Sequence, residues 1–129
     1  MKKILLIEDE EILIEFYEEV FKTAGFEIET IRWGTEALKR LKEIREGKKE
    51  KPDLILLDIV LEDVNGLEIL KEARKYPQTK DLRIFALTAY TDPQLDKELL
   101  KEGIDKILVK TDWTPSRLIP LVKETLGLK

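Results

Sequence analysis

The chain has 129 residues, of which 43% are hydrophobic and 39% charged, with 27 acidic and 23 basic side chains and a net charge of -4. That length suits one compact domain, and the net negative charge gives no general attraction to nucleic acid or to an anionic membrane. Cysteine and histidine are both absent, which excludes disulfides, thiolate chemistry and cysteine-based zinc sites. Carboxylates, hydroxyls and lysines must carry any chemistry, and the metal that suits them is a hard, oxygen-binding cation.

The start of the chain does not resemble a targeting segment. Its apolar stretch Ile4–Ile7 ends at Glu8 and is far too short for a signal peptide or a membrane span. We therefore expect a cytoplasmic protein that binds neither membrane nor nucleic acid. We also expect a single domain over residues 1–129, without an output domain after Lys129.

Short apolar runs alternate with segments of helical periodicity, which predicts the order βαβαβαβαβα. The runs expected to be strands are Ile4–Ile7, Glu27–Ile31, Leu54–Leu57, Ile84–Leu87 and Ile107–Val109. The segments between and after them place apolar side chains at helical spacing, as on the buried face of a helix: Ile12/Phe16/Val20, Ala37/Leu41/Ile44, Ile69/Leu70/Ala73, Leu95/Leu99 and Leu118/Val122/Leu126. The stronger strands lack alternation of apolar and polar residues, which indicates a parallel sheet covered on both faces.

Glycine and proline mark the helix ends. Gly25, Gly47 and Gly103 fall where helical patterns end, the position at which a residue with positive φ closes the last turn. Thr91-Asp92-Pro93 and Thr114-Pro115 are typical of helix starts, with a capping oxygen followed by proline. A chain of this pattern and length forms an open, doubly wound sheet or a related three-layer sandwich, with ligands at the carboxyl ends of the strands.

Polar residues follow the strongest apolar runs. They are Glu8 and Asp9, Asp58, Thr88 and Lys110, and parallel strands would bring them to one edge of the sheet. Clustered carboxylates repel one another, and Mg²⁺ relieves that repulsion while binding phosphate oxygens. Asp58 follows a deeply apolar strand and is the candidate nucleophile for an acyl phosphate. Thr88 and Lys110 would then neutralise the phosphoryl oxygens.

Each of these residues also has a purely structural explanation. The acids of residues 8–11 favour a helix N-terminus, Thr88 could bond to nearby backbone, and Lys110 could be a surface lysine. Asp58 is harder to explain in this way, because a carboxylate directly after an apolar strand risks burial without a partner. The occurrence of all of them at one location of one fold favours a functional site.

Four segments in chain order resemble the response-regulator receiver domain of two-component signalling. They are Lys3–Glu10, Pro52–Gly66, Ala86–Ala89 and Leu108–Lys110, and the resemblance covers nearly the whole chain. It implies a flavodoxin-like (βα)5 sandwich with strand order 2-1-3-4-5. It also implies a phosphorylation-dependent signalling switch.

The same resemblance assigns a metal site. Asp58 would be the phosphoacceptor and a metal ligand, and Asp9 would be a direct ligand of Mg²⁺. Glu8 would act on the metal through water, and the backbone carbonyl of Val60 would complete the protein ligands. Another hard divalent cation would suit these oxygens equally well.

The resemblance also implies the remaining roles and the partners. Thr88 would bond to a phosphoryl oxygen and Lys110 would pair with it. The phosphoryl donor would be a phosphohistidine on a sensor histidine kinase or a phosphotransfer protein. The chain would catalyse only its own phosphorylation and dephosphorylation. As a monomer or a phosphorylation-linked dimer, it would signal to an unidentified protein target through its fourth helix, fifth strand and fifth helix.

Several positions depart from the family pattern without removing a group that the chemistry needs. Thr111 and Glu62 replace prolines, which affects loop geometry, and Ile107 replaces the switch aromatic, which affects the signalling route. In the family, the side chains two positions after the phosphoacceptor and after the threonine flank the path of the attacking water. Here they are Val60 and Tyr90, which predicts slow hydrolysis of the acyl phosphate.

Two other function classes remain as alternatives. An aspartyl-phosphate hydrolase would carry a second acid two residues after Asp58, where this chain has Val60, and valine cannot move a proton. A receiver-like interaction module that has lost phosphorylation would not need the complete set of acids, threonine and lysine. A phosphorylation assay separates this alternative from the switch.

Overall fold

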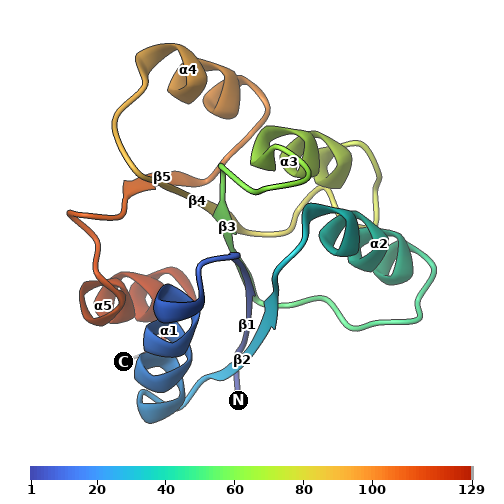
Figure 1. The fold of residues 1–129 in the computed structure, drawn as a ribbon. Helices are drawn as coiled ribbons and strands as arrows, with labels where there is room; N and C mark the ends of the chain where they lie inside the picture. Colours follow the sequence, from blue (N-terminus) through green and yellow to red (C-terminus); the bar gives the residue numbers. More distant parts are fainter. Residues whose placement is uncertain (129) are drawn as a thin grey trace.

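The computed structural model describes residues 1–128 and shows a five-stranded parallel sheet with helices on both faces (Figure 1). The elements are β1 (Lys3–Ile7), α1 (Glu11–Thr23), β2 (Glu27–Ile31), α2 (Gly34–Arg45), β3 (Leu54–Asp58), α3 (Gly66–Arg74), β4 (Ile84–Thr88), α4 (Pro93–Lys101), β5 (Lys106–Val109) and α5 (Pro115–Thr125). The strand order is β2-β1-β3-β4-β5, and every neighbouring pair is parallel. The flavodoxin-like fold and the positions of all five strands are confirmed, to within one residue at each strand end.

The central strands are buried on both faces because successive side chains point to opposite sides of the sheet. In β1, Leu5 and Ile7 join a core cluster with residues of α2, α3 and α4, whereas Ile4 and Leu6 join a second cluster with residues of α1 and α5. Figure 1 shows α1 and α5 together on one side of the sheet and α2, α3 and α4 on the other. This two-sided burial explains the uninterrupted apolar runs of the sequence.

The helix ends follow the predicted glycine and proline signals, but only one of the two predicted side-chain caps forms. Gly25, Gly47 and Gly103 have φ values of 92°, 75° and 87°, a region that favours glycine. The Asp92 side chain accepts a hydrogen bond from the backbone N–H of Leu95 at 3.1 Å, and proline opens both α4 and α5. The capping oxygen predicted at Thr114 is wrong, because Thr114 stands at the N-cap of α5 without a side-chain hydrogen bond to the helix. Within residues 1–128, none of the helices combines the length and apolar character required to cross a membrane.

The predicted buried face of α1 is wrong. Ile12 and Phe16 are 73% and 54% exposed, and the side chains that α1 buries are Ile14, Tyr17 and Phe21. Both sets fit the helical period, because α1 carries apolar residues around much of its circumference. Periodicity alone could not decide which stripe packs against the sheet.

Candidate functional site

All five predicted side chains come from the carboxyl edge of the sheet. Glu8 and Asp9 follow β1, Asp58 and Thr88 are the last residues of β3 and β4, and Lys110 directly follows β5. Glu8, Asp58 and Thr88 are buried, with 0%, 5% and 5% of their surface exposed. Buried polar groups require partners, so the contacts of these residues decide what the site can do.

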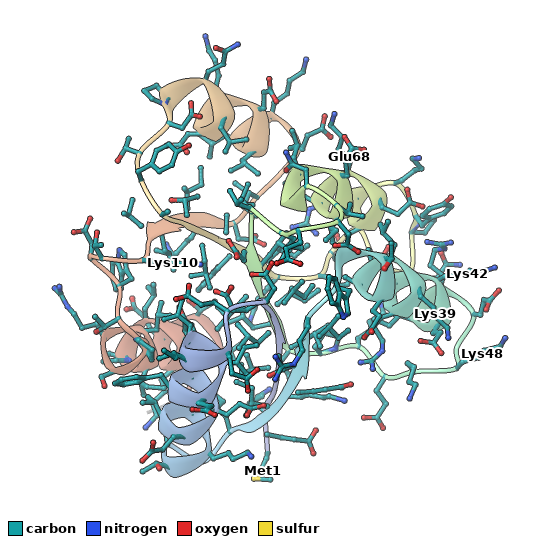
Figure 2. The ribbon with its side chains drawn as sticks, viewed as in Figure 1. Met1, Lys39, Lys42, Lys48, Glu68 and Lys110 are labelled. Atoms are coloured by element: carbon teal, nitrogen blue, oxygen red, sulfur yellow. The ribbon has the colours of Figure 1, made fainter. Side chains whose placement is uncertain are left out.

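Lys110 joins two of the carboxylates. Its Nζ lies 2.9 Å from Glu8 Oε1 and 3.4 Å from Asp58 Oδ2. Figure 2 shows Lys110 next to β5, whereas Lys48 lies at the periphery of the molecule. Burial opposes the charged form of Lys110, but the hydrogen bond to Glu8 and the charge of Asp58 outweigh it, so the pKa of Lys110 is raised. The lysine therefore stays positively charged inside the site.

Glu8 is a fully buried carboxylate with both oxygens occupied. Its Oε1 accepts from Lys110, and its Oε2 accepts the backbone N–H groups of Asp9 at 3.0 Å and Glu10 at 3.2 Å. These bonds compensate the loss of water around the charge. They hold Glu8 in one orientation at the end of β1.

The loop between β3 and α3 contacts the other two carboxylates. The N–H of Val60 donates to Asp58 Oδ1 at 3.2 Å, and the N–H of Glu62 donates to Asp9 Oδ2 at 3.2 Å. Because proline has no N–H, the family's proline at position 62 could not make the second of these bonds. This departure from the family pattern therefore adds a contact to the acidic group.

One ligand atom each of Glu8, Asp9 and Asp58 lies within 4.8 Å of the others. Burial and then the neighbouring Glu8 carboxylate raise the pKa of Asp58 to about 7, while Lys110 opposes the shift. Three carboxylates beside one lysine leave an excess of negative charge in a poorly solvated place. A hard divalent cation with oxygen ligands fits this donor set.

Thr88 supplies a hydroxyl without a partner. Its Oγ1 is buried and makes no hydrogen bond to any other atom within residues 1–128. A buried hydroxyl in this state costs free energy, which an oxygen brought by a ligand would recover. Since β4 lies next to β3 in the sheet, this hydroxyl belongs to the same edge as Asp58.

Gly66 allows α3 to begin directly against the end of β3. Its N–H donates to the carbonyl of Ile59 at 2.8 Å, and a Cβ at this position would lie 2.7 Å from Ile59 Cα and 2.8 Å from the carbonyl oxygen of Asp58. Any side chain would push the helix away from the strand. The glycine thus closes the loop that contains Val60, a residue that is 68% exposed.

The remaining departures from the family pattern are visible in the backbone and core. The peptide between Lys110 and Thr111 is trans. Ile107 is partly buried and packs against the core cluster on the side of α2, α3 and α4. An isoleucine held in this way cannot rotate between two positions as an aromatic ring on the surface can.

Two residues linked to the site were not predicted. Asp63, in the loop between β3 and α3, accepts hydrogen bonds from the start of α2, and these bonds hold its pKa at about 2. Tyr17 of α1 is buried, and burial together with the charges of Glu8 and Asp58 raises its pKa. Neither residue stands at the end of a strand, so position in the sequence pattern gave no signal for it.

Comparison with known proteins identifies the family. Residues 4–123 match the family described as "Response regulator receiver domain". The phosphate regulon transcriptional regulatory protein PhoB of Rhizobium meliloti (strain 1021) is 36% identical over 126 residues, which are 98% of this chain and 52% of PhoB. The polar-differentiation response regulator DivK of Brucella anthropi is 29% identical over 126 residues, covering 98% of this chain and 97% of DivK.

Comparison with solved structures identifies the same family. The crystal structure of the Mn²⁺-bound form of response regulator Rcp1 superposes with a TM-score of 0.82 and 25% sequence identity, covering 96% of this chain and 93% of that one. The chain spans about half the length of PhoB and nearly all of DivK, so the receiver portion is what the matches share. By its sequence and by its fold, the chain belongs to the family of response-regulator receiver domains.

Proposed function

We propose that this chain accepts a phosphoryl group on Asp58 with the help of Mg²⁺ and thereby switches a signalling surface. Receiver domains of response regulators are phosphorylation-based signalling switches, with no catalytic activity beyond their own phosphorylation. The observation that carries the assignment to this residue is the position of Asp58. Asp58 is 5% exposed and ends a central strand, and its carboxylate lies 3.4 Å from the Lys110 ammonium and close to two further acids.

The metal requirement follows from the charge of the site. Receiver domains bind Mg²⁺ at an acidic pocket, and here Asp9, Asp58 and the Val60 carbonyl would hold it. One carboxylate oxygen each of Glu8, Asp9 and Asp58 lies within 4.8 Å of the others, close enough for one cation to be held directly or through water. Glu8 has both oxygens occupied, which favours action through water. The bound cation would supply positive charge to the phosphoryl oxygens.

The reaction itself needs little more than positioning. A carboxylate oxygen of Asp58 forms a bond to phosphorus as the phosphorus–nitrogen bond of a donor phosphohistidine breaks, and the imidazole leaves with the electron pair. The Lys110 ammonium pairs with one phosphoryl oxygen, and the unpartnered Thr88 hydroxyl donates to another. The donor would be a sensor histidine kinase or a phosphotransfer protein.

A partner would recognise the phosphorylated state at the surface formed by α4, β5 and α5. Thr88 directly precedes the loop that leads to α4, so a new hydrogen bond from its hydroxyl would displace that loop. Tyr90, in this loop, is 67% exposed and free to rearrange, unlike Ile107. The recipient would be a protein target or a second copy of the chain. Amide NMR with and without beryllofluoride tests this route, and shifts confined to the metal site would contradict it.

Intact-mass analysis after incubation with acetyl phosphate and Mg²⁺ tests the phosphorylation. We expect one added phosphoryl group in the wild type, and none with a chelator or in Asp58→Asn. Asp53→Asn is a matched control, because Asp53 also adjoins β3 but at its amino end. An Asp58→Asn protein that gained the same mass would remove Asp58 from this role. A wild type that stayed unmodified would favour the phosphorylation-independent interaction module.

A further inference from the structure

Asp63 caps a helix to which it does not belong. Its Oδ1 accepts the N–H of Gly34 at 2.7 Å, and its Oδ2 accepts both the N–H and the hydroxyl of Thr35 at 2.9 Å. Gly34 is the first residue of α2, and Trp33 at the N-cap position provides no side-chain cap. The first N–H groups of a helix have no partner within the helix and favour a negative charge. A side chain of the β3–α3 loop therefore provides the cap of α2.

The loop that carries Asp63 also contacts the carboxylates of the site. Three residues before it, the N–H of Val60 donates to Asp58, and one residue before it, the N–H of Glu62 donates to Asp9. Within this short segment, the backbone thus orients two candidate metal ligands and then attaches to α2. Movement of the segment would change both carboxylates together.

Close packing joins the loop to α2 as well. A Cβ placed on Gly34 would lie 2.5 Å from the Cβ of Val64 and 3.0 Å from Asp63 Oδ1. Real side chains do not approach so closely, so the loop or the helix would have to shift. The glycine permits the approach that the hydrogen bonds of Asp63 require.

We propose that Asp63 is a positioning residue for the divalent cation, because it ties the β3–α3 loop to α2 in the arrangement that orients Asp9 and Asp58. This inference rests on the cation site of the proposed function. Outer partners that orient metal ligands contribute to metal affinity although they do not touch the metal. Linkage makes the effect reciprocal, so a bound cation must strengthen the attachment of the loop to α2.

Titration calorimetry of the unphosphorylated protein with Mg²⁺ measures the predicted effect. We expect Asp63→Ala to weaken Mg²⁺ binding by about tenfold, the lower end of the range for residues that support metal ligands. Asp53→Ala is the matched control, because Asp53 Oδ2 accepts the N–H of Lys3 at 2.7 Å at the opposite edge of the sheet. That variant loses a bond of the same chemistry and should keep the wild-type affinity.

Two further variants separate the attachment from the charge of Asp63. Thr35→Val removes one donor and Gly34→Ala forces the loop from the helix, and neither changes the net charge. Both should weaken Mg²⁺ binding, Gly34→Ala more than Thr35→Val. They also keep the test valid where Asp63→Ala fails to fold. If both variants bound Mg²⁺ with wild-type affinity, the proposal would be overturned. Any weaker binding in Asp63→Ala would then be due to the lost charge alone.

Hydrogen exchange measures the reciprocal effect, which is the effect of bound Mg²⁺ on the attachment of the loop to α2. In the wild type, Mg²⁺ should slow exchange at the amides of Gly34 and Thr35, whose N–H groups bind Asp63. A wild type that did not bind Mg²⁺ at all would overturn the cation site together with this inference. A wild type that bound Mg²⁺ without any slowing at these amides would overturn the role of Asp63 alone.

Discussion

Aspartates lie at both edges of the sheet, but those at the amino edge are partly exposed, whereas Asp58 at the carboxyl edge is buried. At the amino edge, Asp53 and Asp105 accept the N–H groups of Lys3 and Ile84, each at 2.7 Å, and their side chains remain 38% and 44% exposed. At the carboxyl edge, Asp58 is buried beside a second carboxylate. The start of a parallel strand presents N–H groups and its end presents carbonyls, which cannot donate to a carboxylate. The strand itself therefore supplies a donor to an acid at the first edge, whereas the acids at the second edge depend on Lys110 and on N–H groups of the loops.

Removing one aspartate from each edge should change stability in opposite directions. Asp58→Ala relieves the burial and repulsion that raise its pKa, so in metal-free protein at pH 7 we expect a gain of about 2 kcal/mol in the free energy of unfolding. Asp53→Ala leaves a backbone N–H without its partner and should cost about 1 kcal/mol. Urea denaturation with a chelator present measures both. A destabilised Asp58→Ala protein would contradict the comparison.

The destabilisation caused by Asp58 should also make the stability of the protein depend on pH. The pKa of Asp58 is about 7 in the folded protein against 3.8 normally, so the folded state binds the proton more tightly than the unfolded chain. Stability should therefore fall as pH rises from about 4 to about 7, by at most about 1.4 kcal/mol per pH unit. Urea midpoints of metal-free protein measure this slope. It should vanish in Asp58→Ala and persist in Asp53→Ala; a slope retained in Asp58→Ala would assign it to other groups.

The residues at the carboxyl edge could be predicted from the sequence, because the local sequence shows where each strand ends. A buried parallel strand needs an uninterrupted apolar run, so its end, and with it Asp58, Thr88 and Lys110, can be located without knowing the rest of the fold. The strand order came from the family resemblance, since periodicity does not say which strands become neighbours.

The parts that could not be predicted depend on contacts between distant segments. Asp63 lies 29 residues from Gly34 and 28 from Thr35, and no local pattern marks an aspartate that caps a remote helix. In α1, two apolar stripes fit the helical period, and the position of the helix on the sheet selected the one with Ile14 over the one with Ile12. Tertiary packing, and not propensity, made both choices.

The smallest expected effect is at the exposed rim of the carboxyl edge. Val60 and Tyr90 are 68% and 67% exposed, so changing either side chain should leave the buried acids in place. Valine cannot hydrogen-bond to the water that hydrolyses the acyl phosphate, whereas asparagine can hold that water in place. Immobilising one water costs at most about 2 kcal/mol. If the introduced asparagine held the attacking water in advance, part of this cost would no longer add to the activation free energy of hydrolysis. We therefore expect Val60→Asn to shorten the lifetime of the acyl phosphate about threefold.

The decay of phosphorylated protein, followed by intact mass after removal of the phosphodonor, measures this lifetime. Val60→Ala is the control, because it shortens the side chain without adding a hydrogen-bonding group. Faster decay in Val60→Asn than in Val60→Ala would show that the rim sets the duration of the signal by placing water. An equal or longer lifetime in Val60→Asn would count against this role for Val60. In that case, the lifetime would depend on the buried groups that hold the phosphoryl oxygens, among them Thr88 and Lys110.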